Sequence, residues 1–449
     1  MDLTAEIVRA VGLAADPAAV TGHGDGALPS AFAVTDLAVA SIGVAALAAA
    51  ALTGKAETVA VDRRLASGWF GFSLRPIGWE MAAAWDPIAG DYRTADGWIR
   101  LHTNAPHHRR AAEAVLGAWS DRAGMASAVS AWASAELENA VVAAGGCAAE
   151  MRSVAAWAAH PQGQAVAAEP LIHLDPADGG PAPRWAPPAD RPLQGVRVLD
   201  LTRVLAGPVA TRFLAGLGAE VLRIDPPDWD EPGVIPEVTL GKRCARLDLR
   251  SSEDRAVFER LLAGADVLVH GYRDGALDGL GYDAHARRRL SPGLIDVSLN
   301  AYGWTGPWRS RRGFDSLLQM SSGIADAGMA WKGADKPTPL PVQALDHATG
   351  YLMAAAVLAG LRRRRDEGEA VVARMSLART AKLLVDAGQG GAAPPFAPET
   401  PEDLSTGVET TSWGPARRLK PPVDIPGTPL RWPLGARALG SDPPQWDQA

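Results

Sequence analysis

One stretch decides the fold of this 449-residue chain: Gly195-Val196-Arg197-Val198-Leu199-Asp200-Leu201-Thr202-Arg203-Val204-Leu205-Ala206-Gly207-Pro208. Its first seven residues form a largely apolar run that predicts a buried strand, and the next seven form a loop. Residues 209–217 then predict a helix, and residues 219–225 predict a second strand. A strand, a helix and another strand in so short a span are typical of a parallel sheet.

The same alternation continues along the chain. We predict strands at residues 245–249, 267–270 and 294–298, and helices at residues 252–263 and 275–279. The fold class is therefore α/β, with a Rossmann-like parallel sheet in a large domain. Ligands bind such sheets beyond the carboxyl ends of the strands, so the loop at residues 202–208 is a candidate site. The chain lacks the G-x-G-x-x-G and Walker sequences, which disfavours a dinucleotide dehydrogenase and a P-loop enzyme.

Composition and pattern divide the rest of the chain. Residues 86–174 predict a second, smaller α/β domain, because the hairpin signal Asp96-Gly97 is followed by amphipathic helices. Residues 175–192 are rich in Pro, Ala, Asp and Gly and predict a linker. The large domain then occupies residues 193–449 with a C-terminal tail, and residues 1–85 form a helix and strand segment.

Composition also narrows the classes of function. The net charge of -7 disfavours a nucleic-acid-binding surface. Cys147 and Cys244 are the only cysteines and predict two inert thiols in a reducing, cytoplasmic environment. The histidines show no metal-ligand spacing, so we expect no metal site. We expect no signal peptide and no membrane span, because the apolar runs at residues 38–52 and 351–361 are shorter than the roughly 20 residues a span requires.

A single carboxylate opens the second of these apolar runs. The stretch Leu340-Pro341-Val342-Gln343-Ala344-Leu345-Asp346-His347-Ala348-Thr349-Gly350 places Asp346 at the start of a predicted helix that ends at four arginines, residues 362–365. Asp is a common N-cap, and arginines suit the C-terminal end of a helix dipole. Two interpretations are open at this point: Asp346 caps a core helix, or it is a nucleophile mounted on one.

The same pattern occurs near the N-terminus, where Asp36 opens the apolar run at residues 38–52. The strands predicted after these two helices, at residues 58–62 and 370–374, also align with each other after a small shift in register. A helix followed by a strand, occurring twice, indicates an internal duplication. No strand and helix units precede Asp36, so we interpret it as a relic or a helix cap.

The motifs of the large domain resemble, in their order, those of the class III CoA transferases, the formyl-CoA and carnitine-CoA transferase family. Beside the stretch quoted first, the matching elements are Gly241-Lys242-Arg243, Tyr272-Arg273-Asp274-Gly275, Gly303-Trp304-Thr305-Gly306-Pro307, Gly313-Phe314-Asp315 and Asp346. Residues 31–174 resemble the later half of the family, so the chain resembles a rearranged and partly duplicated member. The resemblance implies coenzyme A as a substrate, no metal, and a homodimer as a possible assembly.

The resemblance assigns a role to Asp346, because an aspartate at this position attacks an acyl-CoA thioester in the family. A carboxylate with an ordinary pKa near 3.9 is ionised at pH 7 and needs no neighbouring base. Attack gives a mixed anhydride and frees the CoA thiolate, which then captures the aspartyl group as a thioester. An acceptor carboxylate takes over the CoA by the reverse steps.

The resemblance also implies a set of CoA contacts. They are Val204, Leu205, Ala206, Leu247, Tyr272, Arg273 and Arg312. Core packing is the alternative for the apolar members, and a solvated basic face is the alternative for Arg312. Family members often carry an arginine that contacts CoA phosphate where this chain has Gly279. Some formyl-CoA transferases have glutamine where this chain has Leu205, so oxalate and formate are not favoured as substrates.

Three functions follow from the resemblance. The first is transfer of CoA between an acyl-CoA and a carboxylic acid through Asp346. The second is an acyl-CoA racemase, which is disfavoured because the related α-methylacyl-CoA racemases carry a histidine base where this chain has Phe314, and a phenyl ring cannot move a proton. The third is a non-catalytic CoA-binding protein, favoured by Gly279 and by the rearranged halves.

Overall fold

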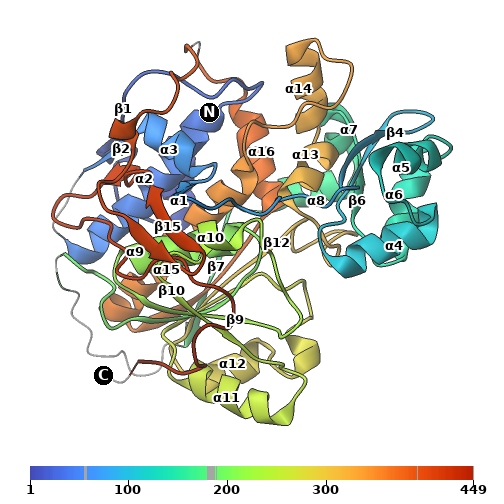
Figure 1. The fold of residues 1–449 in the computed structure, drawn as a ribbon. Coiled ribbons are helices and arrows are strands. Elements are labelled where there is room, and N and C mark those ends of the chain that lie inside the picture. The colour runs from blue at the N-terminus through green and yellow to red at the C-terminus, as the bar shows by residue number, and fades with distance from the viewer. Residues whose placement is uncertain (55–57, 179–187, 189, 392, 448–449) are drawn as a thin grey trace.

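The computed structural model describes residues 1–54, 58–178, 188, 190–391 and 393–447. At its centre lies a seven-stranded sheet with the order β10-β9-β8-β11-β12-β13-β7 (Figure 1). The first six strands in this order are parallel, and β7 pairs antiparallel with β13. The predicted α/β class and Rossmann-like sheet are therefore confirmed. The strands are β7 (His173–Asp178), β8 (Arg197–Leu201), β9 (Glu220–Asp225), β10 (Lys242–Arg246), β11 (Val267–His270), β12 (Ile295–Asn300) and β13 (Glu369–Ser376).

Helices cover both faces of this sheet. On one face lie α9 (Ala206–Gly216), α15 (Ala344–Glu367) and α2 (Val34–Thr53), and on the other lie α11 (Ser252–Ala263) and α12 (Ala284–Leu290) (Figure 1). Side chains alternate between the two faces along each strand. Val198 and Val267 thus join the core cluster with α9, α15 and α2, whereas Leu199 and Leu268 join the cluster with α11.

The start of the predicted linker belongs to this sheet. We predicted a linker at residues 175–192, but its first residues, 175–178, lie in β7. This strand pairs with residues 369–374 of β13. The prediction was wrong there because Pro and Asp suit an edge strand that pairs on one side only. Residues 179–187 and 189 of the predicted linker lie outside the described residues.

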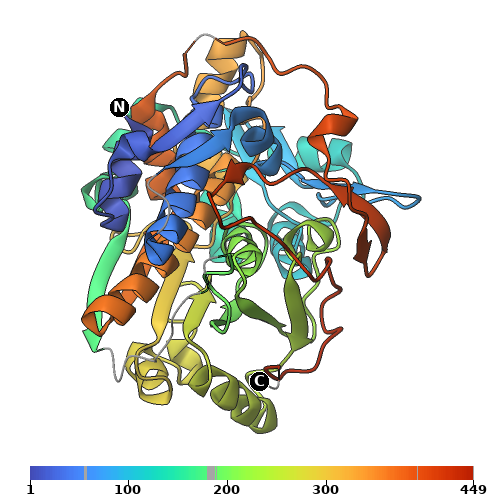
Figure 2. The same cartoon turned by 90° about the vertical axis from the view of Figure 1, so that its left-hand side faces the viewer.

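The repeat is visible as two similar units. In the first, α2 leads into β2 (Val59–Asp62) and α3 (Arg63–Trp69), and in the second, α15 leads into β13 and α16 (Leu377–Ala387). Asp62 caps α3 and Ser376 caps α16, so the units correspond up to the start of their last helices. Figure 2 shows α2 and α15 lying side by side. The N-terminal segment therefore shares the main core, to which α1 (Leu3–Val11) also contributes.

The two apolar helices are longer than the sequence indicated. α2 has 20 residues and α15 has 24, so each is long and apolar enough to cross a membrane. Their most apolar windows are 89% and 100% buried inside the protein. Burial to this degree is typical of core helices in a globular domain, which pass the same test.

The second, smaller α/β unit lies at the right in Figure 1 and has a core of its own. Its strands are β4 (Gly90–Arg93), β5 (Trp98–Leu101) and β6 (Ala148–Glu150), and its helices are α4 (Pro106–Leu116), α5 (Arg122–Val129) and α6 (Ser134–Ala143). The predicted hairpin at Asp96-Gly97 joins β4 to β5. The next helices, α7 (Val154–Ala159) and α8 (Pro161–Ala168), add Trp157 and Val166 to the main core cluster.

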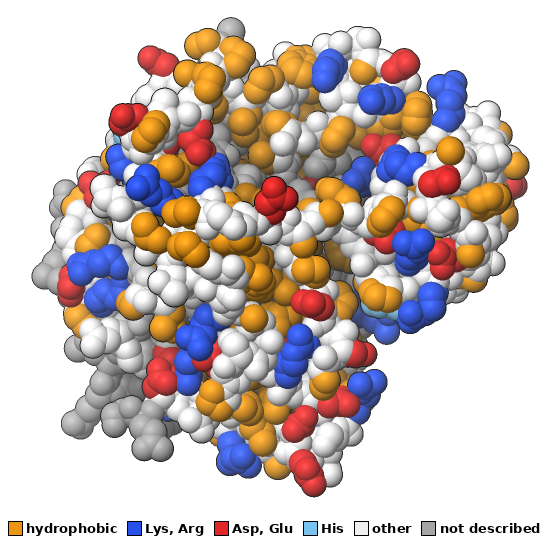
Figure 3. Space-filling model, in the orientation of Figure 1, with side chains coloured by type: hydrophobic (Ala, Val, Ile, Leu, Met, Phe, Trp, Pro, Cys, Tyr) orange, Lys and Arg blue, Asp and Glu red, His pale blue; other side chains and the backbone are white. Residues whose placement is uncertain are grey.

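The C-terminal tail returns to the N-terminal segment. β15 (Gly414–Arg418) pairs with β14 (Glu409–Thr411) and β3 (Leu74–Pro76), and β16 (Val423–Asp424) pairs with β2, which also pairs with β1 (Val20–His23). The remaining helices are α10 (Ile235–Val238), α13 (Asp315–Ser321), α14 (Ile324–Lys332) and the 3-10 turns Pro17–Ala19, Asp278–Leu280 and Pro401–Asp403. On the face drawn in Figure 3, side chains of both charge signs are interspersed.

Candidate active site

Asp346 lies in the first turn of α15 and is only 6% exposed. The N-cap of the helix is Gln343, which makes no side-chain capping bond. Asp346 is therefore not the N-cap, and the capping interpretation of this residue is wrong. Within the described part of the chain, its carboxyl group has no ion pair, so a buried acidic side chain stands at the N-terminal end of a core helix without a cation beside it.

Another carboxylate caps this helix from a different element. Asp315, in the first turn of α13, accepts hydrogen bonds at Oδ2 from the backbone N–H groups of Leu345 (2.9 Å) and Asp346 (3.0 Å). Gln319, one turn further along α13, donates to Oδ1 of Asp315 and accepts the N–H of Leu340 at 2.7 Å. A carboxylate at this position satisfies helix N–H groups that would otherwise be unpaired.

The closeness of the two acids changes their ionisation. Burial raises the pKa of Asp346 well above its ordinary value, and the negative charges of Asp315 and Glu231 raise it further. Burial also raises the pKa of Asp315, to about 6, against the hydrogen bonds that favour its ionised form. The sequence-based expectation of an ordinary pKa for Asp346 is therefore wrong, because it ignored burial and a second acid.

The loop after β8 has a strained backbone. Val204 has a φ of 63° and is the only non-glycine residue with a positive φ within the described ranges. A β-branched side chain disfavours this conformation. Its N–H donates to both carboxylate oxygens of Glu231 at 3.0 Å, which fixes the loop. Strain of this kind gathers at functional sites.

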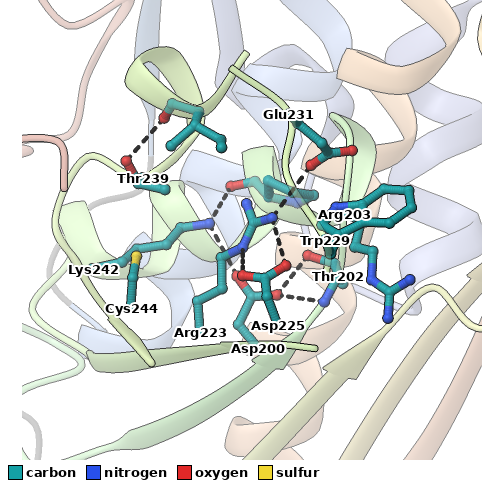
Figure 4. A network of polar contacts seen from close by, with 12 residues as sticks. Asp200, Thr202, Arg203, Arg223, Asp225, Trp229, Glu231, Thr239, Lys242 and Cys244 are labelled. Carbon is teal, nitrogen blue, oxygen red and sulfur yellow. Dashed lines mark hydrogen bonds and ion pairs between the residues drawn. The ribbon is translucent and has the colours of Figure 1, made fainter. Parts of the chain in front are cut away.

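A buried polar network supports the loop (Figure 4). Asp200, at 0% exposure, accepts the N–H of Thr202 at 2.9 Å and the ammonium of Lys242 at 3.0 Å. Arg223 binds both oxygens of Asp225 at 2.8 and 2.9 Å and reaches Glu231 at 3.3 Å. Burial lowers the pKa of Lys242 to about 8, whereas Asp200 opposes that shift. The sequence places Asp200, Arg223 and Asp225 in predicted strands but does not show their partners, so the network was missed.

The loop and the Asp346 helix are in direct contact. A Cβ added to Gly350 would lie 2.4 Å from the carbonyl oxygen of Ala206. Gly350 follows Asp346 by one helical turn, and Ala206 begins α9. Leu205, the N-cap of α9, makes no side-chain capping bond. The second turn of α15 is therefore in contact with the start of α9, near the positive end of each helix dipole.

The predicted CoA contacts fall into three groups. Val204, Leu205 and Ala206 form the strained loop, where Leu205 and Ala206 are also buried in the main core cluster. Leu247 is 4% exposed in the cluster beneath α11, which matches the core-packing alternative. The last three predicted contacts are Tyr272, Arg273 and Arg312.

Tyr272 and Arg273 line a cavity beside the sheet, and the hydroxyl of Tyr272 accepts a hydrogen bond from Arg203 at 3.2 Å. Arg312 instead donates to the carbonyl of Gly145 in the smaller unit at 3.2 Å. The neighbouring Arg311 is buried and pairs with Glu138 at 3.0 Å. Arg311 therefore joins the smaller unit to the large one and does not belong to a solvated basic face.

Gly279 lies in the 3-10 turn Asp278–Leu280 and is exposed. A Cβ added there would meet no atom within 4 Å, and its backbone is not in the left-handed region. The glycine is thus not required by the fold, and a longer side chain has room at this position.

Asp36 provides a contrast with Asp346. Its helix, α2, has Ala33 as N-cap, so Asp36 does not cap it. The side chain is 39% exposed and pairs with Arg63 at 2.8 Å. Two carboxylates at corresponding helix positions therefore have opposite environments, one solvated and paired with a cation, the other buried beside a second acid.

Phe314 precedes Asp315 and packs on two histidines of the smaller unit. Its ring stacks on His102 with centroids 3.7 Å apart and meets His108 edge-on at 5.7 Å. Burial lowers the pKa of both histidines, to about 3 for His108. The position at which a racemase base was considered is thus part of an aromatic contact between the two units.

The chain was compared with known proteins. Residues 193–402 match the family model described as CoA-transferase family III. A probable fatty acyl-CoA transferase of Mycobacterium tuberculosis is 34% identical over 201 residues, 42% of this chain and 50% of that protein. The succinyl-CoA:glutarate CoA-transferase of Mus musculus is 34% identical over 194 residues, 40% of this chain and 44% of that protein. The chain thus spans about half the length of these relatives, or less.

Solved structures are also similar in part. A CAIB/BAIF family protein from Brucella suis is 26% identical, with a TM-score of 0.40, over 50% of this chain and 65% of that one. A hypothetical protein from Mycobacterium tuberculosis is 34% identical, with a TM-score of 0.40, over 42% of this chain and 55% of that one.

Proposed function

Residues 193–402 of this chain belong to the CoA-transferase family III, and from this premise we propose that the protein transfers CoA between an acyl-CoA and a carboxylic acid through Asp346. The observation that supports the proposal is the position of Asp346: a buried carboxyl group that forms no ion pair within the described residues, one helical turn before the contact of Gly350 with Ala206 at the end of the strained loop.

The proposed CoA transfer takes four steps. A carboxylate oxygen of Asp346 attacks the thioester carbonyl, the C–S bond breaks, and the CoA thiolate leaves a mixed anhydride on Asp346. The thiolate attacks the carbonyl carbon of the Asp346 side chain, which forms an aspartyl-CoA thioester and releases the donor acid. The acceptor carboxylate attacks this thioester and frees the thiolate again. The thiolate then attacks the acceptor carbonyl, which gives the new acyl-CoA and regenerates Asp346.

The surroundings of Asp346 suit this chemistry. Its raised pKa makes the ionised carboxylate a stronger nucleophile than an ordinary aspartate. The uncapped start of α9 presents backbone N–H groups near the same place, and such groups stabilise the oxyanion formed at each step. Val204, Leu205 and Ala206 would lie along the CoA chain, with Tyr272 and Arg273 further out and Arg312 as an additional cation.

The test is to trap the intermediate. Incubation with acyl-CoA followed by borohydride reduction or hydroxylamine should modify Asp346, as read by peptide mass spectrometry, while an Asp346→Ala protein should transfer no CoA. Turnover by the variant would contradict the proposal. Binding of CoA without turnover across a panel of acyl-CoA and acid pairs would instead identify a non-catalytic CoA-binding protein. Solvent deuterium entering the α-carbon of the acyl group would identify a racemase.

We propose in addition a cytoplasmic location and a homodimer. Support for the first is that both cysteines are buried free thiols, whose pKa burial raises to about 12. Sedimentation of the full chain would test the second.

A further inference from the structure

The loop between β9 and α10, residues 226–234, contacts the loop after β8 at two consecutive residues (Figure 4). The carboxylate of Glu231 accepts the N–H of Val204 at 3.0 Å with each oxygen. The guanidinium carbon of Arg203 lies 4.6 Å from the centroid of the Trp229 ring. A β-branched residue rarely adopts positive φ, so the conformation of Val204 persists because contacts of this kind hold it.

Glu231 is itself firmly placed. Its carbonyl oxygen accepts the N–H groups of Val234 at 3.0 Å and Ile235 at 3.1 Å, where α10 begins. Its own N–H donates to Oδ1 of Asp230 at 2.9 Å. Arg223 of β9, which is fully buried, lies 3.3 Å from its Oε2. The carboxylate is therefore a fixed part of the structure and can impose its position on Val204.

The charges of the network around Glu231 do not cancel. It holds three carboxylates and two cations, namely Asp200, Asp225 and Glu231 with Arg223 and Lys242. Lys242 pairs with Asp200, and Arg223 binds both oxygens of Asp225 more closely than it binds Glu231. A neutral amide could accept the N–H of Val204 equally well, and a buried charge with incomplete compensation is costly. The charge of Glu231 is therefore not explained by the stability of the network.

This charge acts on Asp346. Burial raises the pKa of Asp346, and the negative charges of Asp315 and Glu231 raise it further. Two other titratable groups near the start of α15 do not offset them. Arg212 of α9 is paired with an acid of α10, and His347 is neutral because burial lowers its pKa to about 3. The ionisation of Asp346 thus depends on acids from two different elements, α13 and the loop after β9.

We propose that Glu231 is a positioning residue of CoA transfer, which holds Val204 in the conformation of the CoA loop and supplies a negative charge, beside that of Asp315, at Asp346. This role rests on the proposed function. Glu231 touches no reacting atom and acts through the loop and through the nucleophile. A carboxylate of higher pKa is the stronger nucleophile once it is ionised, which gives the uncompensated charge a use.

Two variants of Glu231 separate the two parts of this role. Glu231→Asp keeps the charge but withdraws the carboxylate from Val204 by one methylene group, so calorimetry should show CoA bound about tenfold more weakly. The acid limb of the pH profile of kcat/KM should stay in place. Glu231→Gln keeps the reach and one acceptor oxygen, so CoA affinity should stay within about threefold. Its acid limb should move to lower pH by about half a unit, because a negative charge near Asp346 is lost.

Asp228→Asn is the matched control, since Asp228 is an exposed acid of the same loop and makes no hydrogen bond to residues 202–208 within the described structure. It should leave the affinity and the limb unchanged. An unchanged affinity in Glu231→Asp would overturn the loop role, and an unmoved limb in Glu231→Gln would overturn the charge role. Failure of both Glu231 variants to fold, read from their thermal melts, would assign this residue to the fold alone and overturn the proposal.

Failure of the proposed function has a different signature. If the unmodified protein turned over no acyl-CoA and acid pair, CoA transfer would be contradicted and the charge role of Glu231 would fall with it. The loop role would still be decided by calorimetry, which needs CoA only. Absence of CoA binding by the unmodified protein would contradict both the function and the loop role.

Discussion

The carboxylate of Asp315 accepts the backbone N–H of Asp346 at 3.0 Å, so one acid caps the helix that carries the other. A charge on Asp315 stabilises the helix start but opposes a charge on Asp346, because like charges in a buried site disfavour each other's ionisation. The two groups therefore titrate as a pair, and the pair determines the pH at which Asp346 is ionised.

Asp346→Asn should lower CoA transfer by about a thousandfold or more, because it removes the proposed nucleophile without changing the shape of the side chain. The same change should raise the free energy of unfolding by about 1 kcal/mol, since a buried acid beside a second acid is destabilising. Initial rates and thermal melts measure the two effects. Asp36→Ala is the matched control and should leave the rate unchanged, with a stability change below about 1 kcal/mol for an exposed pair.

Asp315→Asn should move the acid limb of the pH profile of kcat/KM to lower pH by about one unit, because the pKa of Asp346 falls when the neighbouring charge is removed. Asp335→Asn, an exposed acid on the segment between α14 and α15, should leave the limb in place. An unmoved limb in Asp315→Asn would mean that burial alone sets the pKa of Asp346.

Stability should depend on pH in the direction set by the same pair. Folding raises the pKa of Asp315 from near 4 to about 6, and that of Asp346 also rises. The folded protein thus binds more protons, so the contribution of the pair is complete below about pH 4 and is lost as the pH rises through about 6. Urea unfolding between pH 4 and 7 should show a smaller such loss in Asp346→Asn than in the unmodified protein.

Val204→Gly should leave the free energy of unfolding unchanged or raise it by up to about 1 kcal/mol, because glycine adopts positive φ without strain. CoA affinity should fall, since the loop is then less ordered before binding. Chemical unfolding and calorimetry test the two effects. Val408→Gly in the exposed tail, where φ is not positive, should lower stability instead. Equal losses in both variants would show that the strain at Val204 costs little.

Gly350→Ala should lower stability by about 1–3 kcal/mol and reduce turnover, because the added methyl group meets the backbone of Ala206 and separates α15 from the loop. Gly360→Ala on the same helix meets only the side chains of Ile295 and Val371 within 3.4 Å, which have more freedom to move. It should therefore cost less and leave turnover intact. Thermal melts and initial rates of both variants decide the comparison.

Gly279→Arg should tighten CoA binding by about tenfold if the CoA phosphates lie beside this turn, as the family resemblance implies. The open surroundings of Gly279 allow the change without loss of stability. Gly407→Arg, at an equally open position in the tail, adds the same charge elsewhere and should not change the affinity. Equal affinities of the two variants would place the phosphates away from Gly279.

Local patterns predicted some elements well, although the strand expected at residues 245–249 lies at Lys242–Arg246 and the helix expected at residues 275–279 is a turn that leads into the 3-10 turn Asp278–Leu280. α11 and β11 have the bounds that the sequence indicated, because an amphipathic helix and a short apolar strand are encoded by neighbouring residues. β7 was missed because its partner in β13 is remote in sequence and its own residues include Pro176 and two aspartates.

The site was predictable only in part. The ordered motifs led to Asp346, but nothing local shows that Asp315 would cap its helix from α13, or that Val204 would adopt positive φ. Tertiary contacts determine both. The sequence likewise does not show that Arg312 would donate to Gly145, which belongs to the other unit.

The contact between α2 and α15 should not depend on the protein concentration. The two helices belong to repeated units of one chain, so their association is intramolecular and has a fixed effective concentration. A similar contact between two separate chains would weaken on dilution. In this protein, α2 should therefore stay packed against α15, the helix that carries Asp346, on dilution.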